Sequence, residues 1–480
     1  MFLTAARLDL ERTLRFLLKS FLFLLPWQTI WIYREVFVNG VKMEYATLGF
    51  YATEVLLWVA AGVFIIWFWR KRKLEIGNLK LKFRLTKDRV FVIACLSLIT
   101  YHLSSVIWSP DKSLALQQSL HVTEAFLLFF MFMCGPLRFG KAVKWLALGA
   151  ILPSLLGIWQ FFSQSAFASK WLGLAEHIAS NPGASVVVGN EAGRWLRAYG
   201  TFSHPNVLGG YVAVVLVLVL LQTADCGLQN KRFLFYSLIT NYLLLMTAVF
   251  FSFSRSAWIA ISVAVAGFVF LLYRAGERLR AFYLFSGGLL LFVVFVSLFS
   301  FMVKERLPAD FQFNFSSSSE IRSIEERQAG YGEAWQIFRA HPWLGVGAGN
   351  YTLALYQLNP NRPGWEYQPA HNVGLLFLAE MGVVGAALLL FVIISFITYH
   401  ISHITYQKPR VDLSRGVTCY MFHGTWYVLC VTCYLTLAFF DHYLISSYIG
   451  LVLTGIFWGL IARGAEEVVP SPSTDYPHSV

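Results

Sequence analysis

The chain has 480 residues, of which 57% are hydrophobic and only 13% are charged. Because a soluble domain carries roughly a quarter charged residues, this composition excludes a water-soluble globular protein and predicts an integral membrane protein. We attribute the formal net charge of +12 to membrane topology and contact with anionic membrane lipids, and expect no nucleic acid among the partners.

Twelve stretches are long and apolar enough to cross a bilayer, which takes about 20 mostly apolar residues. In chain order they are 14–33, 47–69, 90–108, 115–134, 144–163, 206–222, 233–252, 256–273, 281–303, 371–398, 417–440 and 444–462. The first run lacks a small-residue cleavage site, so we expect it to stay as a helix. The predicted fold class is all-α, a polytopic integral membrane bundle of about 12 transmembrane helices. Two long loops, 164–205 and 304–370, are expected to carry function.

The predicted organisation has four parts. Residues 1–205 hold the first five helices and the first long loop, and residues 206–400 form a core with the second long loop. Residues 401–465 form the last helix pair, and residues 466–480 form a disordered cytoplasmic tail rich in Pro, Ser and Thr.

The orientation follows from the distribution of basic residues. Residues 70–89 hold nine Lys and Arg in twenty positions, and the positive-inside rule assigns them to the cytoplasm. Alternating from there places both termini inside and both long loops outside. Cys430 and Cys433 have CxxC spacing, but they fall within an apolar helix, so we interpret them as packing residues.

The first long loop ends in a helix-start pattern next to an arginine. Pro205, with Ser203 or His204 just before it, predicts a helix N-terminus whose free N–H groups face outside. Such an end is a suitable place for an anion, and Arg197 stands within reach. A plain helix cap with an interfacial arginine fits the local pattern equally well.

Arg255 follows between two apolar spans with almost no loop. An arginine near membrane depth is costly and usually has a partner or a function. It could also extend to the interface beside Trp258. We favour a function because the tight hairpin leaves the side chain little freedom.

The second long loop contains a predicted amphipathic helix after Ser316–Ser319, which would lie at the membrane surface and could act as a lid. Its apolar positions are Ile321, Ile324, Tyr331, Trp335 and Phe338, and its charged positions are Glu325, Glu326 and Arg327. Arg327 alone fits a solvated partner of the glutamates better than a phosphate contact. Next, Gly345, Gly347 and Gly349 allow close backbone approach and positive φ without matching a nucleotide-binding fingerprint.

His371 stands at the outer start of the tenth span, where the positive helix end resists its protonation. A neutral imidazole suits a general base for a hydroxyl group, although a capping histidine is the plainer interpretation. Asp441, in the turn between the last two spans, could orient His371, pair with an arginine, or cap a helix. Five distant positions, Arg197, Arg255, Arg327, His371 and Asp441, all fall on the outer side.

Together these segments resemble the O-antigen ligase and polymerase family of bacterial envelope glycosyltransferases, most clearly over roughly 195–400. The similar elements are Arg-x-x-Gly-Thr-Phe-x-His-Pro-Asn at 197–206, Ser-Arg-Ser-Ala at 254–257, Arg327 with Tyr331 and Ala334, His-Pro-x-x-Gly-Val-Gly at 341–347, and His-Asn at 371–372.

The resemblance implies a multi-helix transferase at the outer face of the bacterial cytoplasmic membrane. Its donor would be an undecaprenyl-pyrophosphate-linked glycan, its acceptor a glycan or a lipid core, and it would need no metal and no cofactor. Carried over to this sequence, Arg197, Arg255 and Arg327 would bind pyrophosphate, and His371 would activate or position the acceptor hydroxyl. Asp441 carries over less directly. His204, Asn206 and Asn372 would support the site.

Four functions remain open at this point. A ligase is favoured over a polymerase because His371 and the paired arginines resemble the ligase pattern most. A transporter of an anion or a lipid-linked glycan would place ionisable groups near the midplane within repeated halves, and no repeat is visible. A non-catalytic assembly scaffold would tolerate alanine at His371.

Overall fold

The computed structural model describes residues 2–77, 85–181, 183–189, 193–223, 232–304, 318–406 and 413–467. The predicted tail lies outside the described residues from 468 onward, as does the middle of the predicted cytoplasmic basic run, residues 78–84.

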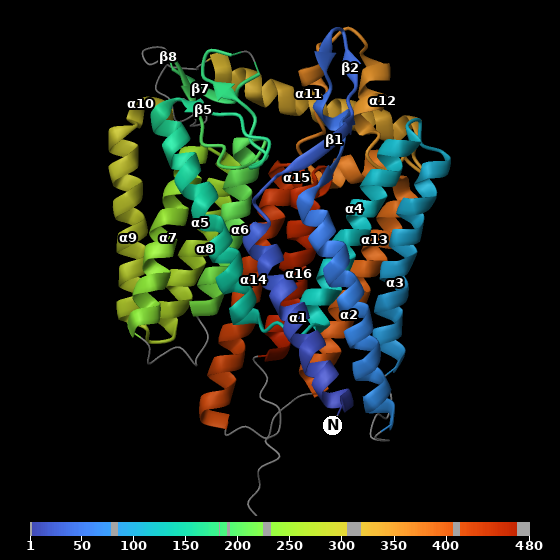
Figure 1. Ribbon diagram of the computed structural model, residues 1–480. Coiled ribbons are helices and arrows are strands. Elements are labelled where there is room, and N and C mark those ends of the chain that lie inside the picture. The colour runs from blue at the N-terminus through green and yellow to red at the C-terminus, as the bar shows by residue number, and fades with distance from the viewer. Residues whose placement is uncertain are drawn as a thin grey trace, which may run out of the picture.

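A long helix corresponds to each of the twelve predicted spans (Figure 1). They are α1 (Phe2–Leu24), α2 (Ala52–Gly77), α3 (Leu85–Ser104), α4 (Lys112–Cys134), α5 (Phe139–Ser163), α6 (Pro205–Thr223), α7 (Arg232–Ser252), α8 (Arg255–Arg274), α9 (Arg278–Leu298), α13 (Val373–Tyr406), α14 (Leu413–Phe440) and α16 (Tyr448–Glu467). Within the described ranges, eight helices are long and apolar enough to cross a membrane, and α7, α14 and α16 contain shorter apolar stretches. The protein is therefore a polytopic helical membrane protein, as predicted.

The predicted end of the first span is wrong. The prediction continued the helix to residue 33, but α1 ends at Leu24. Pro26 follows, and proline disfavours helical geometry in the residue before it and lacks an N–H group. Strand β1 follows at Ile30–Arg34, and its first four residues are β-branched or aromatic. The last span is also interrupted, because a short helix, α15 (Tyr443–Ser446), precedes α16.

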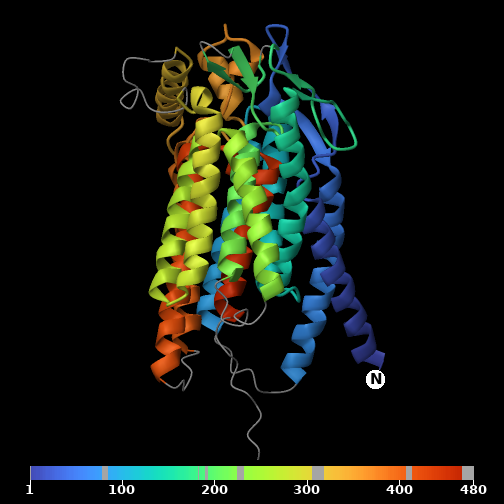
Figure 2. The ribbon, with the colours of Figure 1, turned by 90° about the vertical axis from the view of Figure 1, so that its left-hand side faces the viewer.

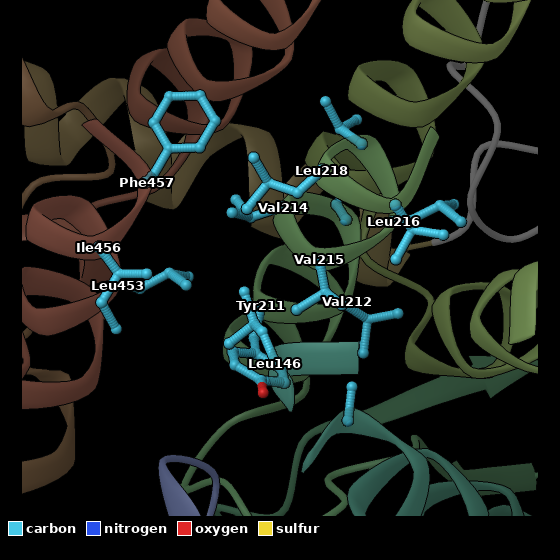
Figure 3. Packing of buried hydrophobic residues seen from close by; sticks show 14 of the residues in the cluster. Leu146, Tyr211, Val212, Val214, Val215, Leu216, Leu218, Leu453, Ile456 and Phe457 are labelled. Atoms are coloured by element: carbon cyan, nitrogen blue, oxygen red, sulfur yellow. The ribbon is translucent and has the colours of Figure 1, made fainter. Parts of the chain in front are cut away.

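Helix α6 forms the centre of the bundle. It contacts α5, α7, α8, α14 and α16, and 89% of its apolar window is buried, against 17% for α9 at the periphery. Figure 3 shows valine and leucine side chains of α6, such as Val214 and Leu218, between Leu146 of α5 and Phe457 of α16. Cys430 and Cys433 lie buried in the same core, which confirms their interpretation as packing residues.

A layer of short elements covers the end of the bundle opposite the N-terminus (Figures 1 and 2). Its helices are α10 (Ser300–Lys304), α11 (Ser318–Ala340), α12 (Tyr351–Leu358), and the 3-10 turns η1 (Glu44–Ala46), η2 (Ser105–Ile107) and η5 (Gly364–Glu366). Its antiparallel strand pairs are β1 with β4 (Leu48–Tyr51), β2 (Phe37–Val38) with β3 (Val41–Lys42), β5 (Ser165–Ala166) with β6 (His177–Ile178), and β7 (Val186–Gly189) with β8 (Gly193–Leu196). The two long loops thus contain ordered hairpins and helices.

Helix α11 matches the predicted amphipathic helix, but its buried side differs. Ala334 and Ile337 are buried in a second core beneath it, whereas Trp335 is 41% exposed. The Trp335 ring is instead tilted by 33° against that of Phe338, and the guanidinium of Arg339 lies over it. The side chains of the predicted apolar residues Ile321 and Ile324 lie outside the described part of the chain.

The glycine-rich segment supports a break in α13. Gly345 and Gly347 have φ of 70° and 97°, and the Gly347 N–H donates to the Glu380 carbonyl at 2.8 Å. At Gly382, φ of 62° interrupts α13, and the Val383 N–H donates to the Pro342 carbonyl at 2.9 Å. A Cβ at Gly345 would lie 2.2 Å from the Glu380 oxygen, so this close approach requires glycine. The role of this loop is therefore structural: its hydrogen bonds hold α13 in place around the break at Gly382.

Candidate active site

Asp441 lies in the turn between α14 and α15, and only 2% of it is exposed. Its Oδ1 accepts a hydrogen bond from Asn206 Nδ2 at 3.0 Å, and its Oδ2 accepts one from the Ser256 hydroxyl. Nδ1 of His371 lies 3.6 Å from Oδ1. The carboxylate therefore joins three residues that are far apart in the sequence.

Each of these partners lies at the beginning of a helix. Asn206 is the second residue of α6, Ser256 is the second residue of α8, and His371 stands two residues before α13. Helix N-termini carry partial positive charge and free N–H groups, which stabilise a nearby anion. Three positive helix ends thus meet at one buried carboxylate, in a region that also suits an anionic ligand.

Arg197 is held behind this centre by three hydrogen bonds. Its Nε donates to the Ser252 carbonyl at 2.7 Å and its Nη1 to the Ser185 hydroxyl at 2.8 Å. Its Nη2 donates to Asn206 Oδ1 at 2.6 Å. Because Asn206 also donates to Asp441, its amide links the guanidinium to the carboxylate. Only 5% of Arg197 is exposed.

The position of His371 is fixed from both sides. The next residue, Asn372, caps α13 by accepting a hydrogen bond from the Leu375 N–H at 2.9 Å, and it donates to the Phe439 carbonyl at 3.1 Å. The Tyr331 hydroxyl on α11 donates to the His371 carbonyl at 3.2 Å. The start of α13 is thereby tied to both the end of α14 and α11. The imidazole remains a quarter exposed.

His204 caps α6, as the helix-start pattern predicts. Its Nδ1 accepts a hydrogen bond from the Asn206 N–H at 3.1 Å, immediately before the helix begins at Pro205. This contact orients the residue that links Arg197 to Asp441.

The three predicted arginines come within electrostatic range of one another. Burial lowers the pKa of Arg197 to about 10, and the positive charges of Arg255 and Arg327 act in the same direction, whereas Asp441 opposes them. Arg255 is the first residue of α8 and Arg327 lies on α11, and both are partly exposed. The outer rim of the site therefore carries accessible positive charge.

The carboxylate of Asp441 is held in its ionised form. Burial alone would raise its pKa, but the contacts with His371 and Ser256 and the charge of Arg327 outweigh burial, so the pKa lies below its usual value. A buried anion of this kind stabilises a positive charge that forms on a neighbouring imidazole.

Two site residues were not singled out from the sequence. The His442 ring lies 4.9 Å from the His371 ring, centroid to centroid, and its Nδ1 is 2.7 Å from the Ser446 hydroxyl. Tyr45 of η1 packs against His442 at 5.4 Å. Burial places the pKa of His442 well below its usual value, and a positive charge formed on His371 acts in the same direction, so the His442 ring is neutral. The adjacency of His442 to Asp441 was the only sequence signal for it, and Tyr45 had none.

Residues 240–390 match the family model described as O-Antigen ligase. The chain carries an O-antigen ligase family domain. The family resemblance drawn from the sequence is confirmed over this segment, and the chain is a multi-pass membrane protein with a segment typical of a glycosyltransferase-type enzyme family. No curated protein matches the chain. The matched segment contains Arg255, Arg327 and His371, and Asp441 joins these residues from outside the segment.

Proposed function

We propose that the protein is an O-antigen ligase-like glycosyltransferase. It moves a glycan from undecaprenyl pyrophosphate to an acceptor hydroxyl at the outer face of the bacterial cytoplasmic membrane. The observation that carries this proposal is the contact set of Asp441, which joins His371 to the starts of α6 and α8 beside three arginines.

His371 acts as the base in this proposal. Its Nδ1 faces Asp441 at 3.6 Å, so Nε2 is the atom that takes the acceptor proton. The gap is slightly longer than a hydrogen bond, and catalytic contacts of this kind often tighten only when substrate binds. As the imidazole becomes positively charged, the ionised Asp441 stabilises it and keeps the ring oriented.

The arginines neutralise the leaving group. Arg255 and Arg327, on the rim, bind the diphosphate, which guanidinium groups can contact in a bidentate manner. Arg197 donates through all of its nitrogen positions to protein groups. We therefore assign it to positioning Asn206 and to the positive potential of the site; direct contact with the diphosphate stays a prediction.

The reaction in this proposal is one displacement at the anomeric carbon. The acceptor oxygen forms a bond to that carbon, the bond from the carbon to the diphosphate oxygen breaks, and undecaprenyl pyrophosphate leaves with the electron pair. His371 takes the hydroxyl proton. Charge neutralisation by arginine stabilises the leaving group, so the proposal requires no metal. A single displacement inverts the anomeric centre, and a product with retained stereochemistry would contradict it.

The test is glycan transfer in proteoliposomes, with a lipid-pyrophosphate-linked oligosaccharide and candidate acceptors, comparing wild type with His371→Ala. We expect the variant to lose at least about 10²-fold in rate, as removal of a general base does. His341→Ala is the matched control, because His341 is an exposed histidine in the same outer layer. It should keep the wild-type rate.

Product length separates the acceptor classes, since a polymerase lengthens a carrier-linked glycan and a ligase transfers it to a different acceptor. Equal rates for wild type and His371→Ala would favour a scaffold and overturn the proposed site. Movement of the donor across the bilayer without bond formation would identify a transporter.

A further inference from the structure

A second group of ionisable side chains is buried inside the bundle. Glu54 lies in the first turn of α2, and His121 and Glu124 lie on α4. Their exposed fractions are 5%, 6% and 1%. Ionisable groups at membrane depth are costly and usually serve a function, and the glycan-transfer proposal uses none of these three.

The three side chains point their donor atoms at one place. One oxygen of each carboxylate and one ring nitrogen all lie within 4.8 Å of one another. Glu54 Oε1 and His121 Nε2 are 3.6 Å apart, which is too long for a hydrogen bond. Two ligands bound tetrahedrally to zinc at ~2.1 Å are ~3.4 Å apart, so this separation fits a shared metal ion.

The two glutamates have fewer hydrogen-bond donors than a pair of buried anions needs. Glu124 Oε1 accepts from Trp58 Nε1 at 2.7 Å, but its buried Oε2 accepts no hydrogen bond from the described residues. Glu54 Oε1 accepts from the Tyr51 N–H at 2.8 Å. In the described part of the chain, His121 is the only basic side chain that pairs with either carboxylate.

Charge balance requires a further positive charge. Two carboxylates and one imidazole carry a net negative charge even when the imidazole is protonated, and an unpaired buried charge costs several kcal/mol. Either a second proton or a bound cation can supply the missing charge. The convergent donor atoms and the unbonded Oε2 favour the cation, because a proton shared between two groups would bring them to hydrogen-bond distance.

We propose that Glu54, His121 and Glu124 bind a zinc ion. Imidazole and carboxylate are both established zinc ligands, and three protein ligands leave one position for water or a nearby hydroxyl. Magnesium and calcium fit less well, because they take six or more ligands that are mainly oxygen atoms.

The ion would stabilise the helices beneath the candidate active site. Tyr448, the first residue of α16, stacks on Tyr51 at 4.4 Å and lies 5.2 Å from the His121 ring. Its hydroxyl is 3.0 Å from that of Thr53. Zinc would thus link α2 and α4 at the point where α16 begins, six residues after the Asp441–His442 turn. Its role is structural, and it does not depend on the reaction proposed above.

The first experiment measures zinc by mass spectrometry in protein purified without a polyhistidine tag. Wild type should hold roughly one zinc per chain, and Glu124→Gln should bind at least about tenfold more weakly. Glu380→Gln is the matched control, because Glu380 is another buried glutamate, and its carboxylate accepts from the Gly349 and Tyr351 N–H groups. It should keep its zinc.

The second experiment uses wild type alone, in case Glu124→Gln fails to fold. Chelator-treated protein is titrated with zinc chloride or magnesium chloride while its melting temperature is measured. Zinc should raise the melting temperature in a concentration-dependent manner, and magnesium should not. A wild-type protein that takes up no zinc and shows no shift would overturn the proposal, as would a folded Glu124→Gln that binds zinc like wild type.

Discussion

Asp441 and Glu124 are both carboxylates buried in the same bundle, yet their surroundings are opposite. Asp441 is surrounded by a hydroxyl, an amide, an imidazole and three helix N-termini. Glu124 lies in the middle of α4, next to a second glutamate, with one oxygen unbonded among the described residues. Both have nearly no exposure to water.

The difference shows how a protein supplies positive charge to a buried anion. Around Asp441 the charge comes from the protein itself, through helix ends and arginines, so the carboxylate stays ionised and available to a neighbouring histidine. Around Glu124 the protein supplies ligand atoms but too little positive charge, so in our proposal a bound cation supplies the rest. The first arrangement suits proton transfer, and the second suits binding of a cation.

The largest expected effect is that of Asp441→Asn on glycan transfer. An amide cannot stabilise the imidazolium of His371, and its NH₂ group must face one of the donors that now point at the carboxylate. By analogy with other Asp–His pairs, we expect a loss of about 10²-fold or more in rate. Steady-state transfer in proteoliposomes measures it. Glu325→Gln, which alters an exposed carboxylate on α11, is the control and should leave the rate unchanged.

Melting temperatures measured in the presence of a chelator extend the comparison of Asp441 with Glu124 to the proposed zinc site. Asp441→Asn should lower the melting temperature, because it replaces a fully bonded anion. Glu124→Gln should leave the melting temperature of the zinc-free protein equal or higher, because it removes one charge from a close pair of carboxylates. If both variants lose the same stability, the contrast between the two sites is wrong.

The next prediction distinguishes Arg255 from Arg197, although the sequence analysis assigns both to pyrophosphate binding. Arg255→Lys, on the rim, should lower transfer about tenfold through weaker diphosphate binding while leaving the melting temperature nearly unchanged. Arg197→Lys should lower the melting temperature, because a single ammonium cannot reach Ser252, Ser185 and Asn206 together. Each charged hydrogen bond lost costs about 1.5–3 kcal/mol. The measurements are KM for the donor and the melting temperature of both variants. If Arg197 were the main diphosphate ligand, Arg197→Lys would raise KM more than Arg255→Lys does.

A smaller effect concerns acid sensitivity at the active site. The folded pKa of His442 lies well below that of an unfolded histidine, chiefly through burial; positive charge on His371, His204 or Arg327 acts in the same direction, and Asp441 opposes it. Unfolded chains therefore bind more protons below pH ~6.5, and stability should fall as the pH drops, by up to about 1.4 kcal/mol per pH unit. Stability arising from Asp441, whose folded pKa is lowered, is lost only near pH 4 and below.

Thermal melting between pH 5 and pH 7.5 checks this expectation. His442→Gln should show a shallower decline than wild type over that range, while the partly buried His177, whose pKa is also lowered by burial, contributes equally to both proteins. Identical slopes would mean that His442 is not held neutral in the folded protein.

The sequence predicted most of the bundle and the gathering of the candidate site residues at one end of it, because both depend on local signals. A continuous apolar run identifies a membrane span. A helix start such as that at Pro205, or an arginine between two spans such as Arg255, can be recognised from a few neighbouring residues of the sequence. The strands between Pro26 and Ala52 gave no comparable signal, because they are short and lie next to an apolar helix.

Contacts between distant single residues could not be predicted in this way. Tyr45 reaches His442, and Glu54 reaches His121, only through the packing of separate elements. Nor does the sequence around Arg197 indicate that its guanidinium is enclosed by Ser252, Ser185 and Asn206. Such features depend on which helix faces meet, and a polar residue inside an apolar span carries little information about its partner.

The smallest expected effect is that of Tyr331→Phe. This change removes one hydrogen bond between α11 and the His371 carbonyl, worth about 0.5–1.5 kcal/mol. Because α11 also carries Arg327, loosening it should raise KM for the lipid-linked donor by about two- to tenfold while kcat changes less. Arg327→Lys should raise the same constant, and the double variant should add little to it, since both changes act on one helix. A fall in kcat alone would instead mean that Tyr331 orients His371. Helix α11 would then contribute to positioning the base and not to binding the donor.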